Sequence, residues 1–242
     1  MRFKLNPVTV PTPKNIFVKQ IEELILSGEV DPGEKIPSER ILAGKMGISR
    51  PVVHEGLIEL ASKGLVTMKP RHGCYINDYR KSGSFELLNA LYHYNSGELT
   101  EEIRDGLEEL RTLIGIDAIQ KITQKPEINK IADELTSIMK EGEILKPGQP
   151  AAKAENDYRF HYTVLYHSGN MIYPLILNSA RGVYLNLLEH FFRTPDIDIS
   201  VNKIKKQLID SMTAGNTDTT SGLMKKLTSY RTYFQESYNA ST

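Results

Sequence analysis

Residues 36–51 have the sequence IPSERILAGKMGISRP, and this stretch decides the fold of the N-terminal part of the chain. Ser38 precedes a short apolar-periodic run that Gly47 stops, and Ser49 then begins a second run. Pro51 falls in the first turn of this second run, where a missing N–H costs a helix little. The stretch therefore predicts two short helices that meet across a tight turn.

Segments on both sides of this helix pair complete a small domain. Before the pair, residues 16–25 repeat apolar side chains every three or four positions, which predicts another helix. After the pair, residues 65–69 and 74–76 are short β-type runs joined by a turn at 70–73, which predicts a hairpin. Three helices followed by a hairpin are typical of a winged helix-turn-helix, which we place at residues 11–79.

The rest of the chain has the pattern of helices alone. Glycine and proline interrupt it repeatedly, so we expect helices separated by short loops. The expected helices span residues 83–94, 99–123, 127–145, 151–168, 172–193, 200–214 and 217–238. We predict a linker at 80–84 and an all-helical antiparallel bundle at 85–242. The predicted fold class is mainly α, an N-terminal winged helix-turn-helix with a two-stranded wing plus a C-terminal helical bundle.

The composition fits a globular chain of more than one domain. The 242 residues include 30 Lys and Arg, 30 Asp and Glu, and 40% hydrophobic residues. A single cysteine, Cys74, excludes an internal disulfide and a cysteine-rich zinc site, which favours a reducing compartment. No apolar stretch approaches the roughly 18 residues of a membrane span, and residues 1–14 lack the apolar core of a signal peptide. We therefore expect a cytoplasmic protein without a membrane partner.

Basic residues are concentrated in the N-terminal third of the chain. Residues 1–81 hold 13 Lys and Arg against nine Asp and Glu, whereas residues 82–242 hold 17 against 21. Contacts with DNA phosphates require such a local excess, although an ordinary solvated surface can have it too. Charge alone therefore leaves both interpretations open, and the helix pair has to decide between them.

The helix pair and the hairpin place several potential DNA ligands together. The second helix of such a pair enters the major groove, where arginine recognises the O6 and N7 atoms of guanine. Hydroxyls at helix N-termini can contact phosphates, and a flexible cationic hairpin tip can enter the minor groove. The candidates are Ser38, Arg40, Ser49, Arg50, Arg71, His72 and Gly73. Simple helix capping by the serines and a solvent-exposed hairpin turn are the structural alternatives.

These residues resemble the N-terminal domain of the GntR family of transcription regulators. The resemblance lies in IPSER at 36–40, MGISRP at 46–51, Glu55, Leu57, Leu60, GLV at 64–66 and Gly73. It implies a dimer that binds a short palindromic DNA operator through Arg40, Arg50 and the wing. His54 stands where the family usually has a second arginine in the recognition helix. We include His54 among the DNA-binding residues and expect a different operator sequence or affinity.

The C-terminal part resembles the FadR branch of this family. The resemblance lies in AENDY at 154–158, SGNMIYPLILN at 168–178, GVY at 182–184 and HFF at 190–192. It is similar to the branch members that bind long-chain acyl-CoA in the bundle and then leave DNA. The resemblance implies a bacterial homodimeric repressor of fatty-acid metabolism. The effector-binding residues that we predict on this basis are Arg111, Asp157, His161, Tyr184, Lys205, Tyr230 and Arg231.

A small carboxylate or sugar acid, with or without a divalent metal, is the alternative effector. Asp157 and His161 are four residues apart on one expected helix, so they share a face and are candidate metal ligands. In the metal-binding pattern of the branch, the other two ligand positions hold Lys205 and Leu227 here. A lysine ammonium can replace a cation electrostatically but cannot coordinate one. We therefore expect neither a metal nor a cofactor.

An enzyme that uses Asp157 and His161 as an acid–base pair is a third hypothesis. No nucleophile motif, glycine-rich phosphate loop or complete metal site accompanies this pair, so we do not expect an enzyme. A purely structural role is also open, because Asp157 and Arg111 could form a buried ion pair between two helices. Tyr184 could likewise belong to the core.

Overall fold

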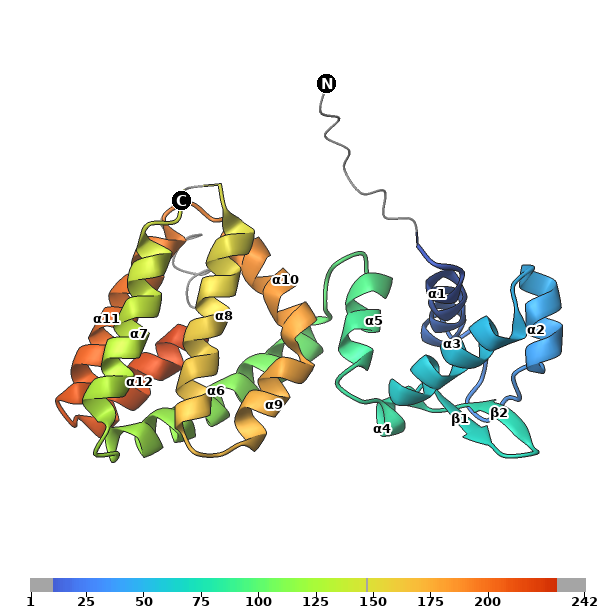
Figure 1. Ribbon diagram of the computed structural model, residues 1–242, viewed down its shortest axis with the longest axis horizontal. Helices are drawn as coiled ribbons and strands as arrows, with labels where there is room; N and C mark the ends of the chain where they lie inside the picture. Colours follow the sequence, from blue (N-terminus) through green and yellow to red (C-terminus); the bar gives the residue numbers. More distant parts are fainter. Residues whose placement is uncertain (1–10, 147, 230–242) are drawn as a thin grey trace, which may run out of the picture. The chain divides into compact units, whose positions relative to one another are not determined.

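The computed structural model describes residues 11–146 and 148–229, which form twelve helices and one two-stranded sheet (Figure 1). They divide into an N-terminal unit that ends at Glu98 and a C-terminal unit that begins at Leu99. The predicted fold class, mainly α with a winged helix-turn-helix and a helical bundle, is confirmed. Within the described ranges, every helix is too short or too polar to span a lipid bilayer.

The N-terminal unit contains the predicted helix pair and wing. Its first elements are α1 (Pro13–Leu26), α2 (Glu39–Met46), α3 (Arg50–Ser62), β1 (Val66–Lys69) and β2 (Gly73–Ile76). Gly47 ends α2 in the left-handed conformation with a φ of 65°, which glycine adopts without steric cost. The strands are antiparallel, with Val66 opposite Ile76 and Lys69 opposite Gly73. A tight turn therefore joins α2 to α3, and the hairpin follows directly after α3.

A continuous apolar core holds α1, α3 and the hairpin together. The fully buried side chains include Phe17 of α1, Val53 and Leu60 of α3, and Leu65 before the first strand. A side chain at Gly56 would lie 2.4 Å from the Phe17 ring, so α3 needs glycine there to approach α1. This core fixes which face of α3 remains exposed.

The segment predicted as a linker includes part of a short helix that contacts the N-terminal unit. Residues 79–82 form the short helix α4 (Tyr79–Ser82), and Ser82 Oγ donates a hydrogen bond of 2.9 Å to the Gly64 carbonyl. The next helix, α5 (Leu87–Tyr94), buries Leu87 and Ala90 in the core beside α1. The two compact units of the structure divide after Glu98, and the linker at 80–84 stays a prediction. An apolar face predicts a helix, but it does not identify the surface that covers it.

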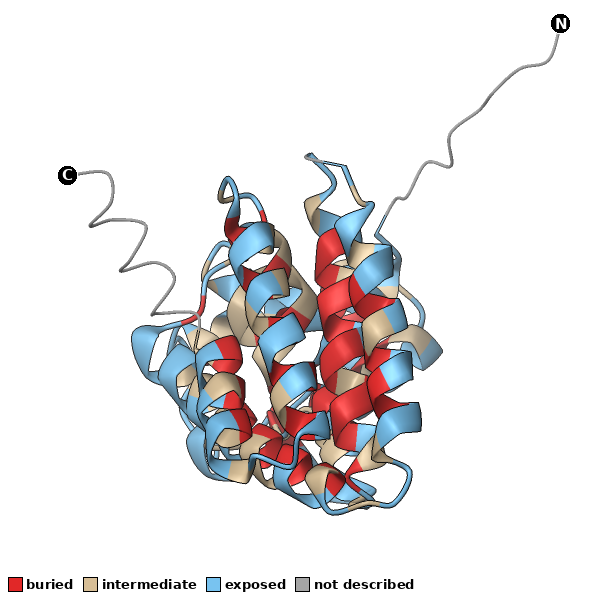
Figure 2. Cartoon of the chain, turned by 90° about the vertical axis from the view of Figure 1, so that its left-hand side faces the viewer, coloured by how far each residue is buried: buried red, intermediate tan, exposed pale blue. Residues whose placement is uncertain are grey.

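The C-terminal unit is a helical bundle around a central helix. Its helices are α6 (Glu101–Thr123), α7 (Ile128–Glu143), α8 (Pro150–His167), α9 (Ile172–Ser179), α10 (Arg181–Phe191), α11 (Ile197–Thr213) and α12 (Thr217–Thr228). The central α8 contacts α6, α7, α9 and α10, while α11 and α12 close the other side against α6 and α7. Figure 2 shows that buried residues lie mainly where these helices face one another.

Two of the expected helices differ from the observed ones. The single helix expected at 172–193 is broken at Ala180, because Asn178, Ser179 and Gly182 all have low helix propensity. The helix expected at 217–238 is α12 as far as Thr228, and its remaining part from 230 onward lies outside the described residues. The apolar periodicity of 172–193 continues across the break because both shorter helices face the same core.

Candidate DNA-binding surface and effector site

The exposed face of α3 carries the predicted recognition residues. Arg50 is the first residue of α3 and is exposed, and His54 lies one turn further on the same face. Val53 and Leu57, which lie next to these residues on the helix, point into the core with 0% and 2% exposure. Arg40 is exposed near the start of α2. The helix pair thus presents arginines at the start of both helices.

Ser38 and Ser49 are the residues that precede α2 and α3. Neither makes a side-chain capping hydrogen bond in the part of the chain that the structure describes. Both residues are exposed, so each hydroxyl is accessible beside a helix N-terminus. A helix N-terminus with an accessible hydroxyl is a suitable partner for a phosphate group. Simple capping, the structural alternative for these serines, is therefore not what the side chains do here.

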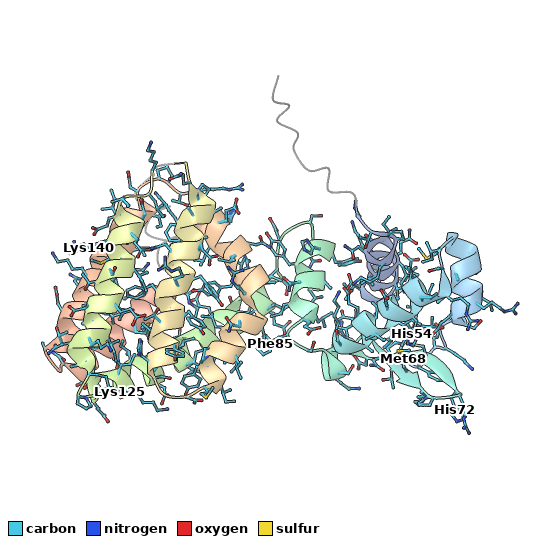
Figure 3. All side chains as sticks on the ribbon, in the orientation of Figure 1. His54, Met68, His72, Phe85, Lys125 and Lys140 are labelled. Atoms are coloured by element: carbon cyan, nitrogen blue, oxygen red, sulfur yellow. The ribbon has the colours of Figure 1, made fainter. Side chains whose placement is uncertain are left out.

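Two lysines that were not among the predicted DNA-binding residues add positive charge to the wing. Arg71 occupies the left-handed region with a φ of 63°, and Arg71, His72 and Gly73 are all exposed at the hairpin tip (Figure 3). The Lys35 and Lys69 ammonium groups lie 5.8 and 5.0 Å from the centre of the Tyr75 ring. Lys35 reaches the wing because its backbone bridges to β2 at Tyr75. In the sequence, the only indication of this contact is that a basic residue, Lys35, directly precedes the IPSER motif.

A second contact that sequence reasoning missed joins α3 to α2. His54 Nδ1 lies 2.7 Å from the carboxylate oxygen Oε1 of Glu39, the first residue of α2. Figure 3 shows His54 on α3. The side chain of His54 is 51% exposed and that of Glu39 is 29% exposed. The imidazole is therefore fixed at one nitrogen and accessible at the other.

In the C-terminal unit, four predicted effector residues meet in one buried polar cluster. This cluster consists of Arg111 from α6, Asp157 and His161 from α8, and Lys205 from α11, with exposures of 9, 2, 4 and 1%. Lys205 Nζ lies 2.8 Å from Asp157 Oδ1. Arg111 Nη2 donates to His161 Nε2 at 3.2 Å and to the Leu227 carbonyl at 3.1 Å. The buried polar cluster therefore connects α6, α8, α11 and α12.

The contacts fix the protonation states inside the buried polar cluster. Burial lowers the pKa of His161, and the guanidinium of Arg111 lowers it further, to about 3. Geometry agrees, because a guanidinium can only donate and so requires a lone pair on His161 Nε2. Burial by itself raises the pKa of Asp157, but Lys205, His161 and Arg111 together outweigh burial and hold that pKa below its ordinary value. At neutral pH the cluster thus contains a neutral histidine and an ionised aspartate.

Aromatic rings border the buried polar cluster. The Arg111 guanidinium lies 5.1 Å from the centre of the Tyr184 ring, and Lys205 Nζ lies 4.8 Å from the centre of the Phe160 ring. Tyr184 is thus placed beside the other four predicted residues. The last two predicted effector residues, Tyr230 and Arg231, lie outside the described residues.

The buried polar cluster does not fit a divalent metal ion. His161 Nε2 and Asp157 Oδ2 are 3.6 Å apart, but Nε2 already accepts a hydrogen bond from Arg111. The Lys205 ammonium occupies the side of Asp157 where a cation would lie. No group of three His, Cys, Asp or Glu side chains suitable for a metal occurs in the ranges 11–146 and 148–229. Two positive side chains replace a metal charge here without coordinating an ion.

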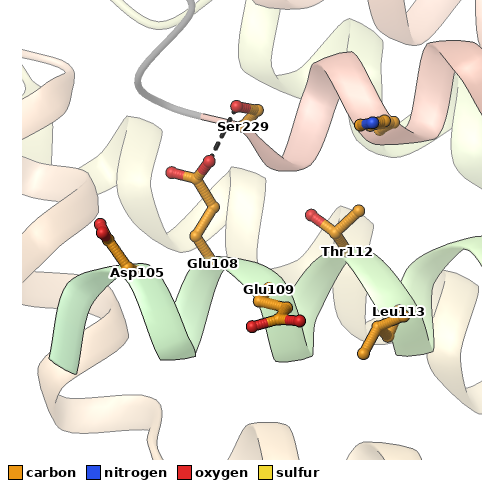
Figure 4. A pocket seen from close by; sticks show the side chains of 7 residues that line it. Asp105, Glu108, Glu109, Thr112, Leu113 and Ser229 are labelled. Carbon is orange, nitrogen blue, oxygen red and sulfur yellow. Dashed lines mark hydrogen bonds between the residues drawn. The ribbon is translucent and has the colours of Figure 1, made fainter. Parts of the chain in front are cut away.

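An open pocket of about 380 Å³ lies between α6 and α12 (Figure 4). Its lining residues are Asp105, Glu108, Glu109, Thr112, Leu113, Lys225 and Ser229. Ser229 Oγ donates to Glu108 Oε1 at 2.8 Å across this pocket. Three carboxylates and one lysine give the lining an excess of negative charge, which does not suit the phosphates of a CoA group.

Comparisons with known proteins agree with this architecture. Residues 16–76 match the bacterial regulatory proteins of the gntR family, and residues 77–240 match the FadR C-terminal domain. The regulator Mce2R of Mycobacterium tuberculosis is 31% identical over 74% of this chain and 73% of its own length. The fatty acid metabolism regulator protein of Pectobacterium carotovorum is 27% identical over 78% of this chain and 76% of its own length.

A solved structure shares the fold. It is that of Lar, described as controlling the expression of the Listeria monocytogenes agr system, with a TM-score of 0.58 and 16% identity over 91% of this chain and 95% of that one. The two matched domains together cover almost the whole described chain, and their families consist of DNA-binding regulators that respond to an effector and are not enzymes. The chain belongs to the GntR family of transcription regulators, in the branch with a FadR C-terminal domain.

Proposed function

We propose that this regulator acts as a homodimeric repressor of fatty-acid metabolism, which long-chain acyl-CoA bound in the helical unit releases from a palindromic operator. Relatives that share most of its length are named fatty acid metabolism regulators. The observation that carries the proposal is the buried polar cluster in the middle of a FadR C-terminal domain. Burying polar groups at such depth costs free energy unless they are paired. A few polar groups inside an otherwise apolar domain are typical of a site that orients a bound ligand.

The buried polar cluster also offers a means of transmitting ligand binding. A ligand that enters between α8 and α12 competes with the contact between Arg111 and the Leu227 carbonyl. Loss of this contact weakens the attachment of the end of α12 to α6, where Thr112 and Thr228 also share a hydrogen bond of 2.8 Å. The ligand can lower the affinity for DNA by no more than the ratio of its own affinities for the two arrangements.

On the DNA side, we propose that Arg50 and Arg40 contact bases and that Ser38 and Ser49 contact phosphates. The wing residues Arg71, His72 and Gly73, together with Lys35 and Lys69, then lie against an adjacent groove. The exposed position of Arg50 at the start of α3 supports this assignment, since the beginning of the second helix of such a pair enters the major groove.

Replacement of Arg50 by alanine is expected to weaken operator binding by about 1–3 kcal/mol and to relax the preference for guanine at one position. The reason is that the exposed first residue of α3 would lose a paired hydrogen bond to a base edge. Fluorescence anisotropy with operator variants measures both effects. Lys19→Ala, on the exposed side of α1, is the charge-matched control and should leave base preference unchanged. Unchanged operator affinity in Arg50→Ala would contradict the assignment.

The effector is tested by calorimetric titration of the purified, metal-analysed protein with oleoyl-CoA. A gel-shift experiment on a palindromic operator, with and without oleoyl-CoA, completes the test. Heat of binding together with loss of the DNA complex supports the proposal. Absence of both, with DNA binding intact, contradicts acyl-CoA as the effector and leaves the DNA-binding function standing.

A small carboxylate or sugar acid is the second candidate effector. The donors in the buried polar cluster favour it, because an arginine guanidinium binds carboxylates in a bidentate manner. Arg111 already donates through Nη2 to two acceptors, and a carboxylate could replace both of them. A panel of small organic acids, tested for release of the protein from operator DNA, distinguishes this candidate from acyl-CoA.

A further inference from the structure

The imidazole of His54 is held in a definite orientation on the exposed face of α3. It lies one helical turn after Arg50, and both side chains are exposed, whereas those of Val53 and Leu57 beside them are buried in the core. Its Nδ1 atom is 2.7 Å from Glu39 Oε1, and half of the side chain remains accessible. Only Nε2 is therefore left to contact a ligand that approaches this face.

The contact with Glu39 determines which hydrogen-bonding group His54 presents. An ionised carboxylate has lone pairs and no proton, so Nδ1 must carry the proton in the hydrogen bond. In a neutral imidazole with a proton on Nδ1, the other nitrogen has a lone pair and accepts hydrogen bonds. With a neutral imidazole, His54 therefore presents an acceptor, whereas an arginine presents only donors.

We propose that His54, oriented by Glu39, recognises the exocyclic amino group of cytosine or adenine and so determines the base at one position of each operator half-site. Cytosine N4 and adenine N6 are the donors on the major-groove edges of the bases. Guanine offers only acceptors there, which would face the lone pair of Nε2. The inference rests on the proposed contact between α3 and DNA and adds the base class that this chain selects.

Arg50 and His54 then make opposite demands on neighbouring positions. The guanidinium of Arg50 favours guanine, and the imidazole one turn later excludes it. The carboxylate of Glu39 is engaged at Nδ1 of the ring that it orients. Glu39 is thus a positioning residue, and its effect should appear in base preference rather than in overall affinity.

The test is a selection of operator half-sites from randomised duplexes with the full chain, comparing wild type with His54→Arg, His54→Ala and Glu39→Gln. The wild type should enrich cytosine or adenine over guanine about tenfold at one position. His54→Arg should convert that position to guanine, and His54→Ala should abolish its preference. In Glu39→Gln the amide can both accept and donate, so the tautomer is no longer fixed and the preference at that position alone should weaken.

Glu23→Gln is the matched control, because it removes an exposed carboxylate from α1 with the same change of charge. Glu23→Gln should leave the base preference at every position unchanged. If the loss of one negative charge were enough to change base preference, Glu23→Gln would change it as Glu39→Gln does. Equal preference for guanine in wild type and His54→Ala overturns the inference while leaving operator binding intact. Failure of the wild type to enrich any palindrome overturns the inference together with the proposed DNA contact.

Discussion

Replacement of Lys205 by methionine is expected to lower the free energy of unfolding by about 3–5 kcal/mol. The ammonium lies 2.8 Å from Asp157 Oδ1, and both side chains are almost completely buried. Methionine keeps much of the volume but removes the charge, so Asp157 would remain ionised or become protonated without its main partner. Either state is costly at this depth. Urea unfolding of the full chain, followed by circular dichroism, measures the loss.

An exposed ion pair in the same unit supplies the control. Lys121 lies 2.6 Å from Asp117 with side-chain exposures of 44 and 43%, and Lys121→Met should cost less than about 1 kcal/mol. The double replacement Lys205→Met with Asp157→Leu should regain much of the loss, because two apolar side chains then fill the site. If Lys205→Met proved no more destabilising than Lys121→Met, the buried pair would not have the strength that its geometry indicates.

The helix pair that carries the proposed DNA-binding residues could be predicted well because its signals are local. Gly47, Ser49 and Pro51 determine a turn and a helix start from adjacent residues, and the position of Arg50 follows directly from them. The contact between His54 and Glu39 could not be predicted in the same way. It depends on the angle between α2 and α3, which the core beneath both helices sets.

The buried polar cluster could be predicted only in part. The spacing of Asp157 and His161 places them on one face of α8, and a family resemblance singled out Lys205 and Arg111. The sequence did not predict that Lys205 pairs with Asp157 or that Arg111 donates to His161. Which cation faces which acceptor depends on the approach of three helices far apart in sequence.

The boundary between the two units shows the same limit. Residues 83–94 have a helical apolar face, and α5 does form within them. That face packs on α1 because Leu87 and Ala90 complete the N-terminal core, which the periodicity of α5 alone could not reveal. Periodicity identifies a buried face, whereas its partner depends on the shape of a core built from distant segments.

Acidification is expected to destabilise the fold well above the pH at which carboxylates protonate, because His161 is buried as a neutral group. Its pKa falls from 6.5 to about 3 on folding, so between these values the unfolded chain binds a proton that the folded chain excludes. Stability from this residue is therefore complete above about pH 6.5 and is lost progressively as the pH falls toward about 3. The loss is on the order of 5 kcal/mol.

The variant His161→Gln separates this effect from the other acidic groups. Glutamine can still accept a hydrogen bond from Arg111 but does not titrate, so unfolding free energies measured by urea between about pH 7 and 4 should show a much smaller slope. His190→Gln, at an exposed position of α10, should keep the slope of the wild type. The pKa of Asp157 is lower in the folded chain, so stability from this residue is lost as the pH falls below about 4. Both variants should show this further loss, because protonation of Asp157 removes the ionic partner of Lys205. An unchanged slope in His161→Gln would show that His161 takes up a proton in the folded state, and the hydrogen bond from Arg111 to Nε2 would then have to break.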